Sequence, residues 1–401
     1  MIANESRTCA ILNEQSLAII LYSEIRMNPG IYTDITNAAY HGGEGISKSG
    51  LDLIHQSPMH FKHARDTAND NERVPTVEQM IGTAFHALVL EPEVFAAEFA
   101  VEPSKACFPD TIDSRDQLVE MVQALNEGRL PKLSLTGGKD ELINRICDNS
   151  DFLPVDLENN KTSELKYIID DLNKARAGLF STTGSMSELA KILRENGKEF
   201  VLWADVKAEL LKTAEGKTIL TGAQFEQVCS MAEAVKAHPV AGKLMRLEAG
   251  LIENSVYWVD EATGELCRCR PDKWLPKSRI VIDLKSTTDA SPEGFAKSIL
   301  NWRYHAQAPF YLDGCSEAIR QSGSDIPEPT TFVFVAVEKK PPYAVGVYAI
   351  GKASIEVGRA EYLNDLAAYA ECKRSGIWPG YCTEVESIEL PAWAMRRAVG
   401  E

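Results

Sequence analysis

The chain has 401 residues, which is enough for two or three domains with a sizeable buried core. Charged residues make up 25% and hydrophobic residues 44% of the sequence, so the composition is that of a folded protein and excludes global disorder. Acidic residues outnumber basic ones 58 to 42, and the formal charge of −16 argues against a surface that coats nucleic acid or an anionic membrane as a whole. A local basic channel is compatible with that charge.

The sequence predicts no membrane-spanning helix. The best apolar run near the N-terminus, residues 17–22, is far shorter than the ~18 residues that a span requires. The same region lacks the basic segment and cleavage site of a signal peptide, because Asn13, Glu14 and Gln15 interrupt it. We therefore expect a cytoplasmic protein whose nine cysteines are mostly free thiols.

Two helical segments are expected in the first hundred residues. Residues 45–65 predict a turn followed by a helix, with Ser47 or Ser49 available as the N-cap. Residues 77–90 carry apolar side chains at three- and four-residue spacing, which predicts an amphipathic helix. His86 lies at the margin of its apolar stripe.

The middle of the chain contains an internal repeat. Residues 114–146 align with residues 161–193 without a gap, and nine of the 33 positions are identical. Each copy predicts a helix, an extended loop and a second helix, a unit too small to bury much core alone. The pair resembles tandem SAP-like modules, small helical elements often used to bind duplex DNA. The alternative is a helical insertion that pads a surface or an oligomer interface.

Strand patterns begin after the repeat. Alternating or β-branched residues predict strands at 254–259, 266–270, 280–284, 331–337 and 344–350. Helices are expected at about 221–238, 292–312 and 354–375. These elements predict an α/β or α+β fold, with a central mixed sheet flanked by helices and an all-helical insertion. We expect residues 1–106 and 201–401 to form the main domain and residues 107–200 to form the insertion.

The most informative feature is an R-P-D motif that ends at Asp272 and is followed by Asp283 and Lys285. In a strand, positions i and i+2 share a face, so Asp283 and Lys285 point the same way, and a preceding antiparallel strand can present Asp272 beside them. Carboxylates of this kind bind Mg²⁺, which leaves its other positions to water and substrate phosphate. The group suits phosphodiester hydrolysis, with Lys285 orienting the attacking water or helping to deprotonate it.

A D-x-K pattern by itself is more often an ion pair on a solvated strand face. Here Val281, Ile282 and Leu284 are apolar and predict a buried central strand, where unpaired charges are unfavourable. This setting favours a functional pair over a surface ion pair.

An ordered series of segments extends the pattern through most of the chain outside residues 107–200. The segments are YHGGEGISKSGLDLI, GTAFHALVLEP, ENSVYWVDEATGELCRCRPDKW, IVIDLKST, RYHAQAPFYLDG, FVFVAVEKKPPYAVGVY and SGIWPGY. Together they resemble the PD-(D/E)XK nucleases, and within them the RecE family of exonuclease VIII-like enzymes. The resemblance implies a restriction-endonuclease-like core.

The resemblance also implies roles for individual residues. His86, Asp272 and Asp283 become metal ligands, and Lys285 becomes the catalytic lysine. Without the resemblance, His86 is more often a surface or core histidine of a helix. Glu253 is either an accessory catalytic acid or a strand-edge charge.

Substrate contacts are expected around residues that follow the D-x-K strand. Gln307 and Tyr311 share a helix face and match a Q-x-x-x-Y element that lies beside the active site in related nucleases; the alternative is a hydrogen-bonding helix face. Arg303 and Tyr304 are candidates for contacts with DNA phosphates, although Tyr304, like Trp302, also fits a core position.

Two further predictions concern serines and cysteines. Ser47 and Ser49 are either helix caps or substrate contacts. No iron–sulfur cluster is expected, because Cys267 and Cys269 lie within a strand pattern and the later cysteines lack the tight spacing of cluster ligands.

The resemblance implies a Mg²⁺-dependent exodeoxyribonuclease, with Mn²⁺ as an alternative ion, that digests one strand of linear double-stranded DNA from 5′ to 3′. It further implies a ring-shaped homo-oligomer, a single-strand annealing protein as a partner in recombination, and a phage or prophage gene. The alternatives are an endonuclease or a 3′-to-5′ exonuclease of the same fold, or a non-catalytic DNA-binding protein that uses the SAP-like modules. The intact set of His86, Asp272, Asp283 and Lys285 argues against the last.

Overall fold

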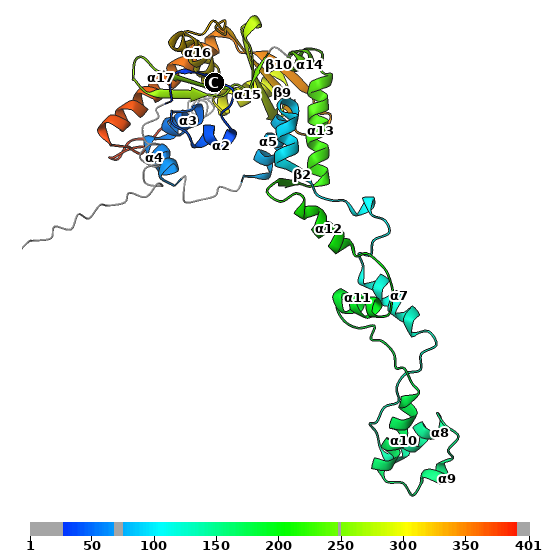
Figure 1. Ribbon diagram of the computed structural model, residues 1–401. Helices are drawn as coiled ribbons and strands as arrows, with labels where there is room; N and C mark the ends of the chain where they lie inside the picture. Colours follow the sequence, from blue (N-terminus) through cyan, green and yellow to red (C-terminus); the bar gives the residue numbers. More distant parts are fainter. Residues whose placement is uncertain (1–26, 68–74, 248–249, 391–401) are drawn as a thin grey trace, which may run out of the picture. The chain divides into compact units, whose positions relative to one another are not determined.

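The structure is a computed structural model that describes residues 27–67, 75–247 and 250–390. The apolar run at residues 17–22 lies outside the described residues. The chain forms two compact units: the main unit comprises the described residues up to Phe99 and those from Ala223 onward, and Ala100–Gly222 form an insertion (Figure 1). The insertion extends further at both ends than the expected 107–200. Within the described residues, no helix has the length and apolar character needed to cross a bilayer.

The main unit contains a five-stranded mixed sheet in the order β10-β9-β8-β7-β4. Its strands are β4 (Leu251–Ile252), β7 (Lys273–Leu275), β8 (Ile280–Thr287), β9 (Thr331–Glu338) and β10 (Val345–Ala349). The central strand β8 runs parallel to β9 and antiparallel to β7. Val281, Ile282 and Leu284 of β8 are completely buried, so the predicted buried central strand is present.

A second, three-stranded sheet is antiparallel and consists of β1 (Gly30–Tyr32), β5 (Ser255–Val259) and β6 (Leu266–Cys269). The helices of the main unit are α2 (Asn37–Gly42), α3 (Lys48–Gln56), α4 (Pro58–Asp66), α5 (Val77–Leu90), α6 (Pro92–Glu98), α13 (Gly222–Ala237), α14 (Pro239–Arg246), α15 (Pro292–Asn301), α16 (Tyr304–Ser322) and α17 (Lys352–Ser375). The long helix α16 packs against both β5 and α17, with Phe310 against Trp258. The fold is therefore mixed α/β, with helices flanking a mixed sheet.

Helix α5 forms over the residues that the apolar spacing predicts. Thr76 and Gln79 close its N-terminus with a reciprocal capping box, in which each side chain accepts a hydrogen bond from the backbone N–H of the other residue. Ala84 and Phe85 are completely buried. His86 follows them directly and stays partly exposed.

The predicted single helix over residues 292–312 is wrong. The structure has two helices, α15 and α16, separated at Trp302 and Arg303. Arg303 has a left-handed backbone conformation with φ of 53°, which ends the α15 hydrogen-bond pattern and turns the chain.

The insertion consists of small helices and one pair of short strands. Its elements are β2 (Phe99–Val101), α7 (Arg115–Asn126), α8 (Lys139–Cys147), α9 (Pro154–Leu157), α10 (Thr162–Lys174), α11 (Met186–Glu195), α12 (Trp203–Lys212) and β3 (Thr218–Leu220). Leu118 and Val122 of α7 pack with Leu189 and Leu193 of α11 in one apolar cluster. A second cluster joins α8 with α10 (Figure 1).

Each apolar cluster of the insertion combines one helix from each copy of the repeat. The first copy supplies α7 and α8, and the second supplies α10 and α11, so the helices are exchanged between copies. The expectation that residues 114–146 and 161–193 fold as two separate SAP-like modules is therefore wrong. The sequence pattern gives the same apolar face to equivalent helices of both copies, so it does not decide between the two pairings.

The exchange is stabilised by equivalent polar contacts from both copies. The side chain of Asn126 hydrogen-bonds to both backbone groups of Phe180, and 47 residues later the side chain of Asn173 hydrogen-bonds to both backbone groups of Leu133. Each extended loop is thereby fixed to the C-terminal end of the first helix of the other copy. The insertion has an approximate internal two-fold symmetry.

Candidate active site

The pairing of β7 with β8 places two aspartates side by side. Lys273 is opposite Ile282, so the next positions along the ladder are Asp272 and Asp283. Asp272 Oδ2 accepts a hydrogen bond from the backbone N–H of Leu284 at 2.6 Å. Asp272 is 9% exposed and Asp283 is 1% exposed, so both carboxylates lie in a buried setting.

Lys285 forms an ion pair with the second of these aspartates. Its Nζ lies 2.6 Å from Asp283 Oδ2 and 4.8 Å from the centroid of the Tyr304 ring. Burial acts to lower the pKa of Lys285, but Asp283 and Asp272 outweigh burial and raise that pKa above its ordinary value. Lys285 is therefore a fixed cation at neutral pH.

Gln307 of α16 orients Asp283 from the other side. Its Nε2 donates a hydrogen bond to Asp283 Oδ1 at 2.5 Å. Asp283 Oδ2 is buried, and the ammonium of Lys285 lies 2.6 Å from it. Tyr311, one turn further along α16, instead packs edge-on against Phe332. Of the predicted Q-x-x-x-Y pair, Gln307 contacts a site carboxylate and Tyr311 joins the core.

Three candidate ligand residues form a compact cluster. His86, Glu253 and Asp272 each place one ligand atom within 4.8 Å of the others, and His86 Nδ1 lies 3.5 Å from Asp272 Oδ2. Glu253 follows β4 in a left-handed conformation with φ of 50°, which residues other than glycine seldom adopt and which often marks a functional position. An imidazole nitrogen with carboxylate oxygens is a donor set for a hard or borderline divalent cation.

The acidic groups of this cluster repel one another in a buried environment. Burial, followed by the charges of Asp272 and Glu91, raises the pKa of Glu253 to about 9. Burial and the charge of Asp283 raise the pKa of Asp272 to about 6. The accumulated negative charge is unfavourable on its own, so a bound cation stabilises the ionised cluster.

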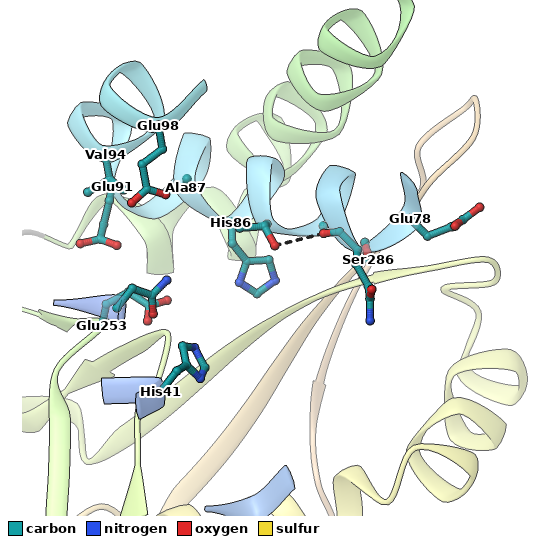
Figure 2. Close-up of a pocket in the computed structure, with 13 residues that line it drawn as sticks. His41, Glu78, His86, Ala87, Glu91, Val94, Glu98, Glu253 and Ser286 are labelled. Carbon is teal, nitrogen blue, oxygen red and sulfur yellow. Dashed lines mark hydrogen bonds between the residues drawn. The ribbon is translucent and has the colours of Figure 1, made fainter. Parts of the chain in front are cut away.

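A cavity of about 440 Å³ lies beside the cluster. Figure 2 shows Glu91, Glu98 and Glu253 directed toward the same hollow, with His86 descending from α5 and His41 near Glu253. The sequence analysis missed Glu91 and His41 as site residues. The sequence feature that could have identified Glu91 is its position five residues after His86, at the end of the same helix.

The structure gives Arg303 a different role from the predicted phosphate contact. Its guanidinium forms ion pairs with Asp52 at 2.9 Å, Glu361 at 3.2 Å and Asp365 at 2.6 Å, and its side chain is 13% exposed. Three carboxylates already compensate its charge. Arg303 therefore stabilises the turn between α15 and α16.

Ser47 and Ser49 lie at the start of α3. Ser47 Oγ accepts a hydrogen bond from the N–H of Gly50 at 3.3 Å and lies 3.0 Å from Ser49 Oγ, so Ser47 is the N-cap. Both serines line a cavity of about 820 Å³ together with Arg65 and Lys373. Their contact with substrate stays a prediction.

Comparison with known families places the chain in one of them. The family described as a PDDEXK-like domain of unknown function (DUF3799) matches residues 188–391, which is half of the chain. The chain belongs to this family. The match includes Asp272, Asp283 and Lys285, whereas His86 lies outside it. Membership of a PDDEXK-like family supports a nuclease.

No curated protein matches the chain. Among solved structures, the "Putative exonuclease" from Eubacterium rectale is similar over 57% of this chain and 84% of that chain, with 14% sequence identity and a TM-score of 0.32. Similarity at this level does not define a function.

Proposed function

We propose that the chain is a metal-dependent exodeoxyribonuclease that acts on linear double-stranded DNA. The supporting observation is the convergence of His86 from α5, Asp272 and Asp283 from adjacent strands, and Lys285 on the face of β8 that carries Asp283. Glu253 adds a third carboxylate to the same place. This combination of a cation site and a fixed lysine beside a cavity suits hydrolysis of a phosphodiester.

The residues of the site fit a divalent metal ion. His86, Asp272 and Asp283 would hold it, with Glu253 as a further carboxylate. His86, Glu253 and Asp272 each place one ligand atom within 4.8 Å of the others, and Asp283 lies beside Asp272 on the neighbouring strand. Mg²⁺ is the proposed ion because it prefers carboxylate oxygens, and the imidazole makes Mn²⁺ the alternative. When bound, the ion supplies positive charge that stabilises the phosphoryl transition state and favours ionisation of water.

Lys285 acts by charge and position in this proposal. Its raised pKa keeps it protonated at neutral pH, so it stabilises negative charge on the phosphate and orients the attacking water instead of removing a proton from it. Gln307 holds Asp283 in one orientation through Oδ1. Tyr304 supports the lysine with its ring face.

The finer parts of the proposal rest on the resemblance to the RecE family. They are 5′-to-3′ digestion, 3′ single-stranded tails passed to an annealing partner, and a ring-shaped homo-oligomer. An acidic exterior with a basic lumen reconciles the formal charge of −16 with DNA binding. The helical insertion, Ala100–Gly222, is proposed to bind duplex DNA.

The test is digestion of linear duplex DNA, labelled separately at each 5′ and 3′ end, by the full chain. We expect progressive release of the 5′ label with Mg²⁺, no release with EDTA, and a loss of at least about a hundredfold in rate for Asp283→Asn. Asp325→Asn, which changes an exposed aspartate in a loop, serves as the matched control and retains the rate.

Other outcomes redirect or refute the proposal. Release of the 3′ label first, or cutting of closed circles, keeps the metal site but contradicts the exonuclease polarity. Binding of DNA without cleavage under any metal condition refutes the enzyme and supports the non-catalytic DNA-binding protein.

A further inference from the structure

Trp302 is an exposed aromatic side chain beside the proposed catalytic lysine. It is 65% exposed. It lines a cavity of about 520 Å³ together with Lys285 and Tyr304, and that volume is typical of a site for a small molecule or one nucleotide. The cavity lies next to the one at His86, since Glu78 and Ser286 line both.

The backbone that carries Trp302 is fixed although its ring is exposed. The N–H of Trp302 donates to the carbonyl of Ser298 at 3.0 Å, and its own carbonyl accepts from Lys48 Nζ at 2.8 Å. Arg303, the next residue, is held by its three ion pairs. A ring presented on such a fixed turn loses little conformational entropy when it contacts a ligand.

The other aromatic side chains of this cavity are already engaged. Phe295 is 1% exposed and stacks on Tyr348 at 5.6 Å between ring centroids. The ring of Tyr304 contacts Lys285, whose Nζ lies 4.8 Å from the ring centroid. Among the described residues, the ring of Trp302 has no aromatic or cationic neighbour. It is the aromatic face of this cavity that is available to a ligand.

The remaining lining of the cavity suits a phosphate-bearing ligand. It includes residues with hydroxyl or ammonium groups, which are Thr76, Ser286, Thr287, Thr288, Ser298, Lys285 and Lys339. Glu78 contributes one carboxylate against these two lysines. An aromatic face next to hydroxyl and ammonium groups is the combination that binds a nucleotide, with the base on the ring and the phosphate toward the cations.

We propose that Trp302 stacks on a nucleobase of the DNA strand being digested, next to the scissile phosphate. The 520 Å³ cavity then binds the unpaired end of that strand. Stacking on an aromatic face is tolerant of base identity, so Trp302 contributes affinity for a single-stranded end without reading its sequence. This inference rests on the proposed nuclease function, and it adds a subsite to it.

The experiment measures DNA binding by the full chain in EDTA, with a fluorescently labelled duplex that ends in three unpaired nucleotides. Each unpaired nucleotide is replaced in turn by an abasic residue. We expect Trp302→Ala to weaken binding of the intact DNA about 5- to 150-fold. One abasic position weakens binding by the wild-type chain to a similar extent and has no further effect in Trp302→Ala, because both changes remove the same contact.

Two control variants separate stacking from other effects. Trp302→Phe retains an aromatic face and restores most of the affinity. Leu300→Ala changes a side chain that is 67% exposed, two residues away and outside the cavity lining, and it leaves the affinity unchanged. Circular dichroism and light scattering of each variant check the fold and the oligomer mass.

Several results would overturn the inference. They are wild-type affinity in Trp302→Ala, an abasic penalty that persists in Trp302→Ala, and an equal loss in Leu300→Ala. A change of oligomer mass in Trp302→Ala with an unchanged abasic penalty would instead assign the ring to a protein contact. Because binding is measured in EDTA, a wild-type chain that stacks on DNA but never cuts it with Mg²⁺ refutes the proposed function and not the stacking contact.

Discussion

Substitution of Gln307 by Ala tests whether Asp283 must be held in one orientation. Gln307 is 6% exposed and donates a hydrogen bond to Oδ1 of a carboxylate that is 1% exposed. Hydrogen bonds to charged groups contribute about 1.5–3 kcal/mol, so we expect the free energy of unfolding in EDTA to fall by about that amount. Residues that orient a metal ligand usually contribute about 10- to 100-fold to metal affinity, so half-maximal cleavage should require about 10- to 100-fold more Mg²⁺.

The assay is denaturant unfolding in EDTA combined with cleavage rates over a Mg²⁺ titration. Gln321→Ala is the matched control, because Gln321 lies on the same helix and its side chain hydrogen-bonds to both backbone groups of Val259 and to Glu317, and not to Asp272 or Asp283. Gln321→Ala should lower stability without changing the Mg²⁺ requirement. A folded Gln307→Ala variant with the wild-type Mg²⁺ requirement would refute the role assigned to Gln307.

Three further predictions follow from the same geometry. The pKa values of Asp272 (about 6) and Glu253 (about 9) are raised above their unfolded values, so between about pH 4 and pH 9 these two groups bind more protons in the native metal-free protein than in the unfolded chain. Its free energy of unfolding in EDTA should therefore fall as pH rises through that window and be restored by Mg²⁺; a pH-independent unfolding free energy would contradict this. Arg303→Ala removes one partner from each of three carboxylates, which keep contacts with Lys48, His305 and His55. It should destabilise the fold by about 1.5–3 kcal/mol while leaving the salt dependence of DNA binding unchanged. A weaker salt dependence of DNA binding in a folded Arg303→Ala variant would instead support the predicted contact between Arg303 and a DNA phosphate. Leu118→Ala should cost about 2–5 kcal/mol and remove hydrogen-exchange protection from α7 and α11 while α8 and α10 stay protected. Loss of protection in α8 instead of α11 would show that each copy folds by itself.

The sequence allows the centre of the site to be predicted because strand geometry is simple. Side chains two residues apart share a face, and an antiparallel neighbour lies directly opposite, so Asp272, Asp283 and Lys285 meet as expected. Helix α5 is equally predictable, since both its apolar spacing and its capping box are local. These features depend on residues close together in the chain.

The features that the sequence does not predict depend on distant partners. The break at Arg303 requires Asp52, 251 residues earlier, and two acidic residues of α17, none of which is visible in the local helical pattern. The left-handed turn at Glu253 is likewise set by its position beside Asp272, whose carbonyl accepts a hydrogen bond from the N–H of Glu253. Local periodicity does not carry information on such contacts.

The exchange of helices in the insertion changes what a break in the chain does there. If each copy folded alone, a cut between α8 and α10 would release two independent modules. In the exchanged arrangement, α7 and α8 lie on one side of such a cut and α10 and α11 on the other, and both apolar clusters span it. The two fragments remain associated through two interfaces and the hydrogen bonds between each loop and a helix of the other copy, so they complement each other like halves of a split protein. Deletion of either copy, in contrast, leaves two helices with no partner.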